Sequence, residues 1–203
     1  HLGDILDAYF RPELLIHFAD KFRDGVGNRQ GRRLDDLLHD QSWTDCVSNL
    51  TGLHRLGLHG LAFTPLWDPV EADELLPAIL KHGVAVIETP LLDPKNYDSA
   101  GTRAVAEKYG VEIVCSLGLP TEIDVATQME DAVDFLTFAL KVARDAGANC
   151  LSGVTYGSIG KTSGAPVTQS ELDVTARLLD RVAKPARDFN LKLGIEPCNR
   201  YET

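Results

Sequence analysis

Two glutamates near the end of the sequence, Glu196 and Glu202, stand where a carboxylate can do chemistry. Apolar and polar residues alternate over 191–195, Glu196 follows, and Pro197 cannot donate a further hydrogen bond to a sheet. This pattern predicts a buried strand that ends on an acid. An asparagine and an arginine separate the two glutamates, so the loop is rich in groups that bind hydroxyls or a metal. A solvated acidic loop is the alternative, because glutamate is usually a surface residue.

The elements that must position these acids begin near residue 57, where short apolar runs start to alternate with amphipathic helical patterns. Nearly continuous apolar strands separated by helices are typical of parallel β/α units. We expect strands over about 60–64, 84–88, 111–116, 150–156 and 191–195, and helices over about 71–81, 98–109, 126–146 and 169–189.

Local signals mark several helix ends. Gly110 and Gly147 follow helical patterns at the position of a glycine C-cap, and Thr168 with Glu171 forms a capping-box pattern. Pro185 lies within the last helical pattern and predicts a kink or an early end. A straight helix through it would cost about 3 kcal/mol.

Parallel β/α units form either an open doubly wound sheet or a barrel of eight strands. An open sheet normally has a glycine-rich phosphate loop after its first strand, whereas residues 65–69 contain no glycine. The sequence therefore predicts an α/β fold of the (β/α)8 TIM-barrel type. Because such a barrel needs about 250 residues, we expect it to be incomplete, with about five units over 56–203. Residues 1–55 are interpreted as a helical N-terminal extension.

Catalytic groups of such barrels lie at the carboxyl ends of the strands. Glu88 ends the second predicted strand and Glu196 the last, so two acids are expected on one face of the barrel. A carboxylate there is costly unless it is paired or binds a metal. For Glu88 a structural salt bridge or hydrogen bond that fixes neighbouring loops is an equal alternative.

The segment from Glu196 to Glu202 resembles the E-x-x-N-R-F/Y-E signature of the ketose 3-epimerases, which are xylose-isomerase-like sugar isomerases and epimerases. That resemblance implies that Glu196 binds a divalent metal and acts as a catalytic acid/base. It also implies that Glu202 forms a hydrogen bond to the sugar.

The resemblance extends over roughly residues 57–203 and implies further substrate-binding residues. Glu88 is similar to a glutamate that lies near the sugar, and Ser116 to a small residue that borders the substrate. Trp67 is similar to an aromatic residue that forms a wall of the pocket. Ile159 stands where the family often has an aromatic residue, so the far end of the sugar is expected to be held differently.

By this resemblance the function is metal-dependent C3 epimerisation of a small-molecule ketose through an enediolate, with Mn²⁺, Mg²⁺ or Co²⁺ as cofactor. The remaining ligands of the family, an Asp, a His and a Glu, come from later strands. We therefore expect the 203-residue chain to be an inactive fragment of an isomerase. Residues 157–162 end like a phosphate-binding loop but lack its first glycine, so a flexible loop with Lys161 near the substrate is expected instead.

The composition of the chain limits the classes of binding partner and the cellular location that we expect. A net charge of −10, with scattered Lys and Arg, disfavours nucleic acid. No apolar run is long enough to span a membrane and no secretory signal begins the chain, so a cytoplasmic protein is expected. The four cysteines lie far apart and are interpreted as reduced thiols. An open arc of strands would leave an edge that favours aggregation or a homo-oligomer.

Two alternatives stay open. Related barrels include hydroxypyruvate isomerases and inosose dehydratases, and also apurinic-site endonucleases, which the acidic charge disfavours. The chain is otherwise a non-catalytic binding or assembly module derived from a TIM barrel, because a fold does not dictate a function.

Overall fold

A computed structural model describes residues 56–62, 64 and 66–198 of the chain. The predicted extension over 1–55 and the residues from 199 onward, Glu202 among them, lie outside this part. The strands are β1 Leu56–His59, β2 Val84–Pro90, β3 Glu112–Gly118, β4 Cys150–Val154 and β5 Lys192–Leu193. The α-helices are α5 Pro69–Ile79, α6 Ser99–Tyr109, α7 Met129–Asp145 and α8 Gln169–Asp188, and the 3₁₀ helices are η2 Gly60–Ala62 and η3 Leu80–His82.

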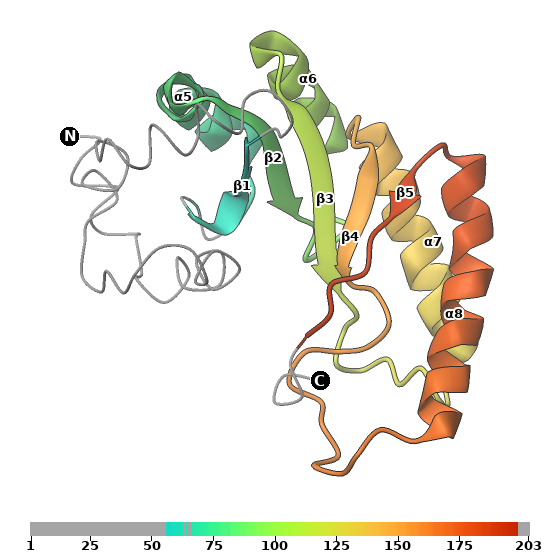
Figure 1. The fold of residues 1–203 in the computed structure, drawn as a ribbon. Coiled ribbons are helices and arrows are strands. Elements are labelled where there is room, and N and C mark those ends of the chain that lie inside the picture. Colours follow the sequence, from blue (N-terminus) through green and yellow to red (C-terminus); the bar gives the residue numbers. More distant parts are fainter. Residues whose placement is uncertain (1–55, 63, 65, 199–203) are drawn as a thin grey trace.

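The strands form one parallel sheet of five in the order β1-β2-β3-β4-β5 (Figure 1). A doubly wound sheet reverses its strand order at a switch point, whereas this order follows the chain throughout. Right-handed crossovers then place every helix on the same face of the sheet. Consecutive helices pack on one another, α5 on α6, α6 on α7 and α7 on α8. The expected partial barrel-like arrangement of β/α units is confirmed.

The first strand lies earlier than expected. The prediction placed it over 60–64, but β1 is Leu56–His59 and a 3₁₀ turn begins at Gly60. The backbone amide of Leu61 donates to the ring of His59, and the amide of Thr64 donates to the carbonyl of Gly60. These bonds close a turn in the apolar stretch that the pattern assigned to a strand. The first strand therefore ends at His59 and not at Thr64.

The helix ends follow the local signals. Asp68 caps α5 by accepting from two backbone amides, with Pro69 in the first helical position. Gly110 ends α6 with a φ of 64°. Thr168 and Glu171 form the predicted capping box of α8.

Pro185 does not end α8, which continues to Asp188. The ring removes the hydrogen bond to the carbonyl four residues earlier, but only a few residues of helix follow. Val182 and Ala186, on either side of the proline, are buried, so packing holds the last turn in place. The expected early end was wrong for this reason.

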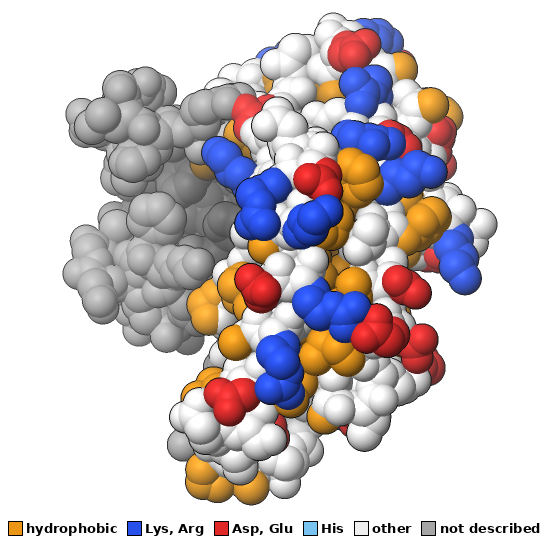
Figure 2. Space-filling view, turned by 90° about the vertical axis from the view of Figure 1, so that its right-hand side faces the viewer, with side chains coloured by type: hydrophobic (Ala, Val, Ile, Leu, Met, Phe, Trp, Pro, Cys, Tyr) orange, Lys and Arg blue, Asp and Glu red, His pale blue; other side chains and the backbone are white. Residues whose placement is uncertain are grey.

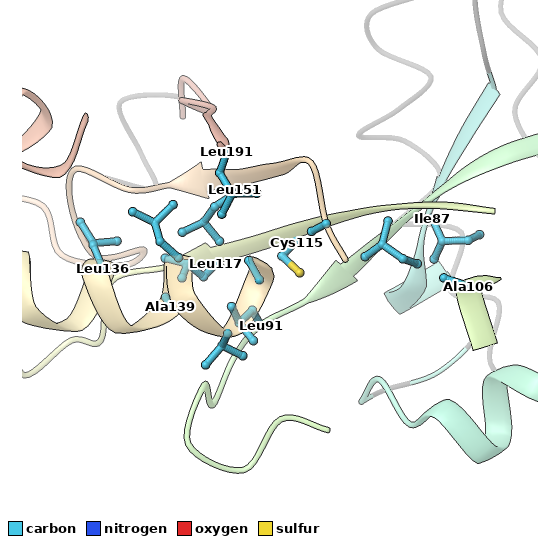
Figure 3. Close-up of a cluster of buried hydrophobic side chains, with 14 of the residues drawn as sticks. Ile87, Leu91, Ala106, Cys115, Leu117, Leu136, Ala139, Leu151 and Leu191 are labelled. Carbon is cyan, nitrogen blue, oxygen red and sulfur yellow. The ribbon is translucent and has the colours of Figure 1, made fainter. Parts of the chain in front are cut away.

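One face of the sheet packs on the helices and forms the core (Figure 3). Alternate residues of β2, β3 and β4 supply it, together with residues of α5, α6, α7 and α8. The buried set includes Ile87, Leu91, Ala106, Cys115, Leu117, Leu136, Ala139, Leu151 and Leu191. Burial of this apolar surface drives the fold and fixes which residues point the other way. We call the face of the sheet opposite the helices the inner face.

The outer surface formed by the helices carries charges of both signs. Figure 2 shows Lys and Arg side chains lying among Asp and Glu side chains on this face. Arg181 of α8, for example, binds Glu130 of α7 through both of its terminal nitrogens at 2.6 Å. None of the helices in the described part of the chain is long and apolar enough to cross a membrane.

Candidate active site

Three polar side chains gather on the inner face where β1, β2 and β3 end. Ile87 and Thr89 are buried on the core side of β2, so Glu88 between them points to the inner face. Ser116 alternates in the same way with Cys115 and Leu117 on β3.

His59 lies at the centre of this group and contacts both other residues. Its Nε2 atom is 3.6 Å from Oε1 of Glu88 and 3.3 Å from Oγ of Ser116. The side chains of His59 and Glu88 are 26% and 31% exposed, so solvent or a ligand can reach them. Two residues predicted to bind sugar, Glu88 and Ser116, are thus brought together by a histidine. We call His59, Glu88 and Ser116 the His59 cluster.

The hydrogen bonds of His59 determine which ring nitrogen carries its proton. Nδ1 accepts the backbone amide of Leu61 at 3.0 Å, so Nδ1 has no proton of its own. In the neutral ring the proton is then on Nε2, which becomes a donor directed at Ser116 and Glu88. The cluster therefore contains one fixed donor, one acidic acceptor and one hydroxyl that can do either.

Glu196 reaches the inner face through a hydrogen-bond ladder that is longer than β5 itself. The amides of Lys192, Gly194 and Glu196 donate in turn to the carbonyls of Asn149, Leu151 and Gly153, at 3.0, 2.8 and 2.9 Å. Alternate residues of a strand share a face, so Glu196 points to the side of Gly194.

The side that Gly194 faces is the inner one. A Cβ atom on Gly194 would lie 2.6 Å from Oγ of Ser152, and Ser152 alternates with the core residue Leu151. Glu196 itself is exposed. The regular strand is shorter than the predicted 191–195, but its ladder does end on the acid.

Tyr156 holds the segment that follows Glu196. Its hydroxyl accepts the backbone amide of Cys198 at 3.2 Å. Burial first, and then the nearby charges of Cys198 and Glu196, raise the pKa of this hydroxyl. The phenol therefore stays neutral at physiological pH and can accept this bond.

Register relates the two predicted strand-end acids. Glu88 pairs with Val114, and the same line runs through Cys150 to Lys192, four residues before Glu196. Strands of an eight-stranded barrel with a shear of eight step by about one residue per strand. Three strand steps account for about three of those residues, so the two acids lie at similar heights. Along the sheet they are about 14 Å apart, from a spacing of about 4.8 Å per strand.

The indole N–H of Trp67 forms a hydrogen bond to the helix layer and not to the His59 cluster. Its indole N–H donates to Oγ1 of Thr102 in α6 at 2.9 Å. Its ring lies beside Gly60, where a Cβ atom would be 3.3 Å from Cε3. The side chain is half-buried and anchored to the helix layer.

The loop after β4 is tied to the loop after β3. Lys161 pairs with Asp124 at 2.9 Å, and this contact holds the pKa of the Asp124 carboxyl below its usual value. Ser158 donates to the carbonyl of Pro120 at 2.9 Å. Ile159 lies over Gly118: a Cβ atom added to Gly118 would be 3.5 Å from Cδ1 of Ile159. Lys161, which was expected near the substrate, forms this ion pair.

The donor set for a metal is partial. Among the described residues, no group of three or more His, Cys, Asp or Glu lies close enough to bind a metal ion. Glu196 offers an exposed carboxylate at the end of β5, which suits a hard divalent cation as one ligand. A hollow of about 260 Å³ lies at the opposite, amino end of β3, beside Gly110, Glu112 and Gly147. It lies away from the strand-end side chains described above, so we assign it no site.

Sequence reasoning missed His59 and Tyr156. His59 was missed because the first strand was placed four residues too late. A strict alternation was present, since Leu56 and Leu58 pack toward the core while Gly57 and His59 do not. The bond from Cys198 to Tyr156 joins residues 42 apart and left no signal in the sequence.

Comparison with known proteins agrees with this architecture. The ketose 3-epimerase of Arthrobacter globiformis is 29% identical over 153 residues, which are 73% of this chain and 53% of that protein. The L-ribulose 3-epimerase of Methylomonas sp. (strain DH-1) is 30% identical over 152 residues, 72% of this chain and 52% of that protein. No protein-family model matches the chain.

A solved structure, D-allulose 3-epimerase from Methylomonas sp. in complex with D-allulose, superposes with a TM-score of 0.66 at 28% identity. The match covers 72% of this chain and 52% of that one. The chain thus spans about half the length of the curated relatives it matches. Over about 73% of its length the chain is similar to ketose 3-epimerases, and it has a partial TIM-barrel fold.

Proposed function

We propose that this chain supplies part of the active site of a sugar epimerase that inverts C3 of a ketose through an enediolate. The observation that carries the proposal is the ladder that brings Glu196 to the inner face at the end of β5. The named relatives, a ketose 3-epimerase and an L-ribulose 3-epimerase, support the reaction class.

Glu196 would exchange the proton of C3. Inversion beside a carbonyl requires that a proton leaves one face of the carbon and returns to the other. A carboxylate that is exposed on the inner face can take that proton, and a second acid/base must act on the opposite face. Tyr156 keeps the segment carrying Glu196 in place through Cys198.

A divalent cation, Mn²⁺, Mg²⁺ or Co²⁺, would supply Lewis-acid stabilisation of the enediolate when bound. Glu196 fits one of its ligand positions, and the family resemblance implies an Asp, a His and a Glu besides. We therefore expect the 203-residue polypeptide alone to be inactive. No described contact favours hydroxypyruvate isomerase or inosose dehydratase activity over epimerisation.

Residues on the first three strands would hold the rest of the sugar. Glu88 and Ser116 lie together on the inner face and offer an acceptor and a hydroxyl. The ring of Trp67 would form a wall at the edge beside Gly60, with its N–H anchored to Thr102. Glu202, outside the described residues, would bind a sugar hydroxyl as the resemblance implies.

The direct test uses the complete product of the gene that encodes this chain, purified, stripped of metal and reloaded with Mn²⁺. D-allulose is the first substrate, because a relative was solved with it bound. We expect formation of the C3 epimer, detected by chromatography, and loss of it in EDTA with recovery on adding Mn²⁺. A complete gene product that binds Mn²⁺ but epimerises no ketose would contradict the proposal and favour a binding module.

A further inference from the structure

The contacts within the His59 cluster leave part of the hydrogen-bonding capacity of its side chains available. The separation of 3.6 Å between Nε2 of His59 and Oε1 of Glu88 is too long for a hydrogen bond, and 3.3 Å to Ser116 is at the long end. The cluster therefore presents an accessible donor and an accessible acceptor side by side.

We infer that His59 is a specificity-determining residue, whose Nε2–H donates to a ketose hydroxyl remote from the reacting carbon while Glu88 accepts from the same sugar. This inference rests on the proposed function. A hydroxyl both donates and accepts, so a fixed donor beside a carboxylate matches one hydroxyl or two adjacent ones. Charge-assisted bonds to Glu88 add to the selectivity.

The position of the cluster explains which part of the sugar it reads. Glu88 lies three strands and His59 four strands from Glu196, about 14 and 19 Å along the sheet. These distances follow the curved sheet, whereas in an eight-stranded barrel strands four steps apart face each other across an interior that side chains just fill. A ketose with C3 at Glu196 therefore extends its other end across this interior toward the His59 cluster. Ile159 over Gly118 closes that side with an apolar group.

A purely structural role is the competing explanation. The backbone ladder already joins the strands, since His59 pairs with Glu88 and Pro90 with Ser116. The cluster side chains add little to that pairing, because His59 and Glu88 are partly open to solvent. The bond that Nδ1 accepts from the Leu61 amide is a structural contact of the ring, and it can be tested separately from the contacts of Nε2.

Two substitutions separate the two ring nitrogens. Asparagine keeps an acceptor near the position of Nδ1 for the Leu61 amide but does not reach the position of Nε2. Glutamine places an amide donor near Nε2. His82→Gln is the matched control, because His82 is exposed in η3, away from the inner face.

The assay measures kcat and KM of the Mn²⁺-loaded complete gene product for D-allulose and for its 4-deoxy, 5-deoxy and 6-deoxy analogues. For D-allulose we expect His59→Asn to raise KM about 3- to 10-fold, as for loss of one hydrogen bond, with kcat within about twofold. His59→Gln should restore most of the KM, and His82→Gln should change nothing. For one deoxy analogue His59→Asn should add no further rise, because the partner hydroxyl is already missing.

A rise in KM that is the same for all four sugars, or a glutamine variant no better than the asparagine variant, would overturn the specificity role alone. A wild-type enzyme that epimerises none of the four sugars would overturn the proposed function and this inference with it. Circular dichroism melting of each variant verifies that it is folded at the assay temperature.

Discussion

The hydroxyl of Tyr156 and the backbone amide of Cys198 are joined by a hydrogen bond of 3.2 Å, which ties the segment after β5 to the end of β4. Glu196 lies two residues before this bond and is itself bonded through its amide to Gly153. The backbone that carries the proposed acid/base is thus held on both sides.

Tyr156→Phe removes the acceptor of that bond and keeps the ring. We expect kcat of the complete gene product to fall about 3- to 10-fold with little change in KM, because a less ordered Glu196 weakens proton transfer rather than sugar binding. Tyr109→Phe is the control, since it removes a tyrosine hydroxyl that donates to the backbone carbonyl of Asp73 in the helix layer. Equal effects of the two variants on kcat would exclude a positioning role for Tyr156.

The pairing of β4 with β3 requires a glycine at position 153, opposite Leu117. Its φ is 105° and a Cβ atom would lie 2.1 Å from the carbonyl oxygen of Leu117. Gly153→Ala should lower the free energy of unfolding by about 4 kcal/mol or more, because a backbone atom cannot move aside. Gly160→Ala also has a positive φ but open space around it, so about 1–2 kcal/mol is expected. Urea unfolding measures both, and similar losses would show that φ alone decides.

Alkaline pH should destabilise the fold through the Cys115 thiol and the Tyr97 hydroxyl, two buried groups that both contact the hydroxyl of Thr89. Burial raises the pKa of the Cys115 thiol from 9.0 to about 11, and burial also raises the pKa of Tyr97. Above pH 9 the unfolded chain loses the thiol proton while the folded chain keeps it, so stability falls as pH rises. Cys115 alone should account for about 2 kcal/mol by pH 11.

Urea unfolding at pH 8 and pH 11 checks this prediction. Cys115→Ala should be less stable than the wild type at pH 8 but lose about 2 kcal/mol less between the two pH values. Parallel pH profiles of wild type and variant would mean that the thiol is not protected by burial.

Trp67 should affect stability and sugar binding through different atoms. Trp67→Phe removes the donor to Thr102 and keeps an aromatic ring, so a loss of about 1 kcal/mol in stability without a change in KM is expected. Trp67→Ala removes the ring as well and should raise KM in addition. If Trp67→Ala leaves KM unchanged in a folded enzyme, the ring is not a wall of the pocket.

The sequence was sufficient for the strand count, the helices and the barrel-type order, because these depend on local patterns. Each of these patterns determines the conformation of only a few neighbouring residues. Examples are a glycine after a helix, the capping box at Thr168 and the alternation of apolar residues in a strand. The local pattern placed the first strand wrongly, because the residues before and after Gly60 are both largely apolar. A bond from Leu61 to the His59 ring and a register shift between Leu56 and Gly57 decide it.

The candidate site was predictable only in part. Glu88 and Ser116 were expected in the substrate pocket from the family resemblance, whereas their meeting through His59 depends on the register between strands. The ion pair between Lys161 and Asp124, which joins the loop after β4 to the loop after β3, was not predicted either. Such pairs join residues tens of positions apart, and no local pattern specifies them.

The most direct measurement follows the C3 proton of a ketose by NMR in D₂O with the Mn²⁺-loaded complete gene product. We expect exchange at C3 in the wild type, a loss of at least about 100-fold in Glu196→Gln, and no loss in Glu122→Gln. Glu122 is an exposed glutamate after β3 at the same edge of the sheet, so it controls for a general loss of charge. Exchange at the wild-type rate in Glu196→Gln would contradict the role of Glu196 as the acid/base.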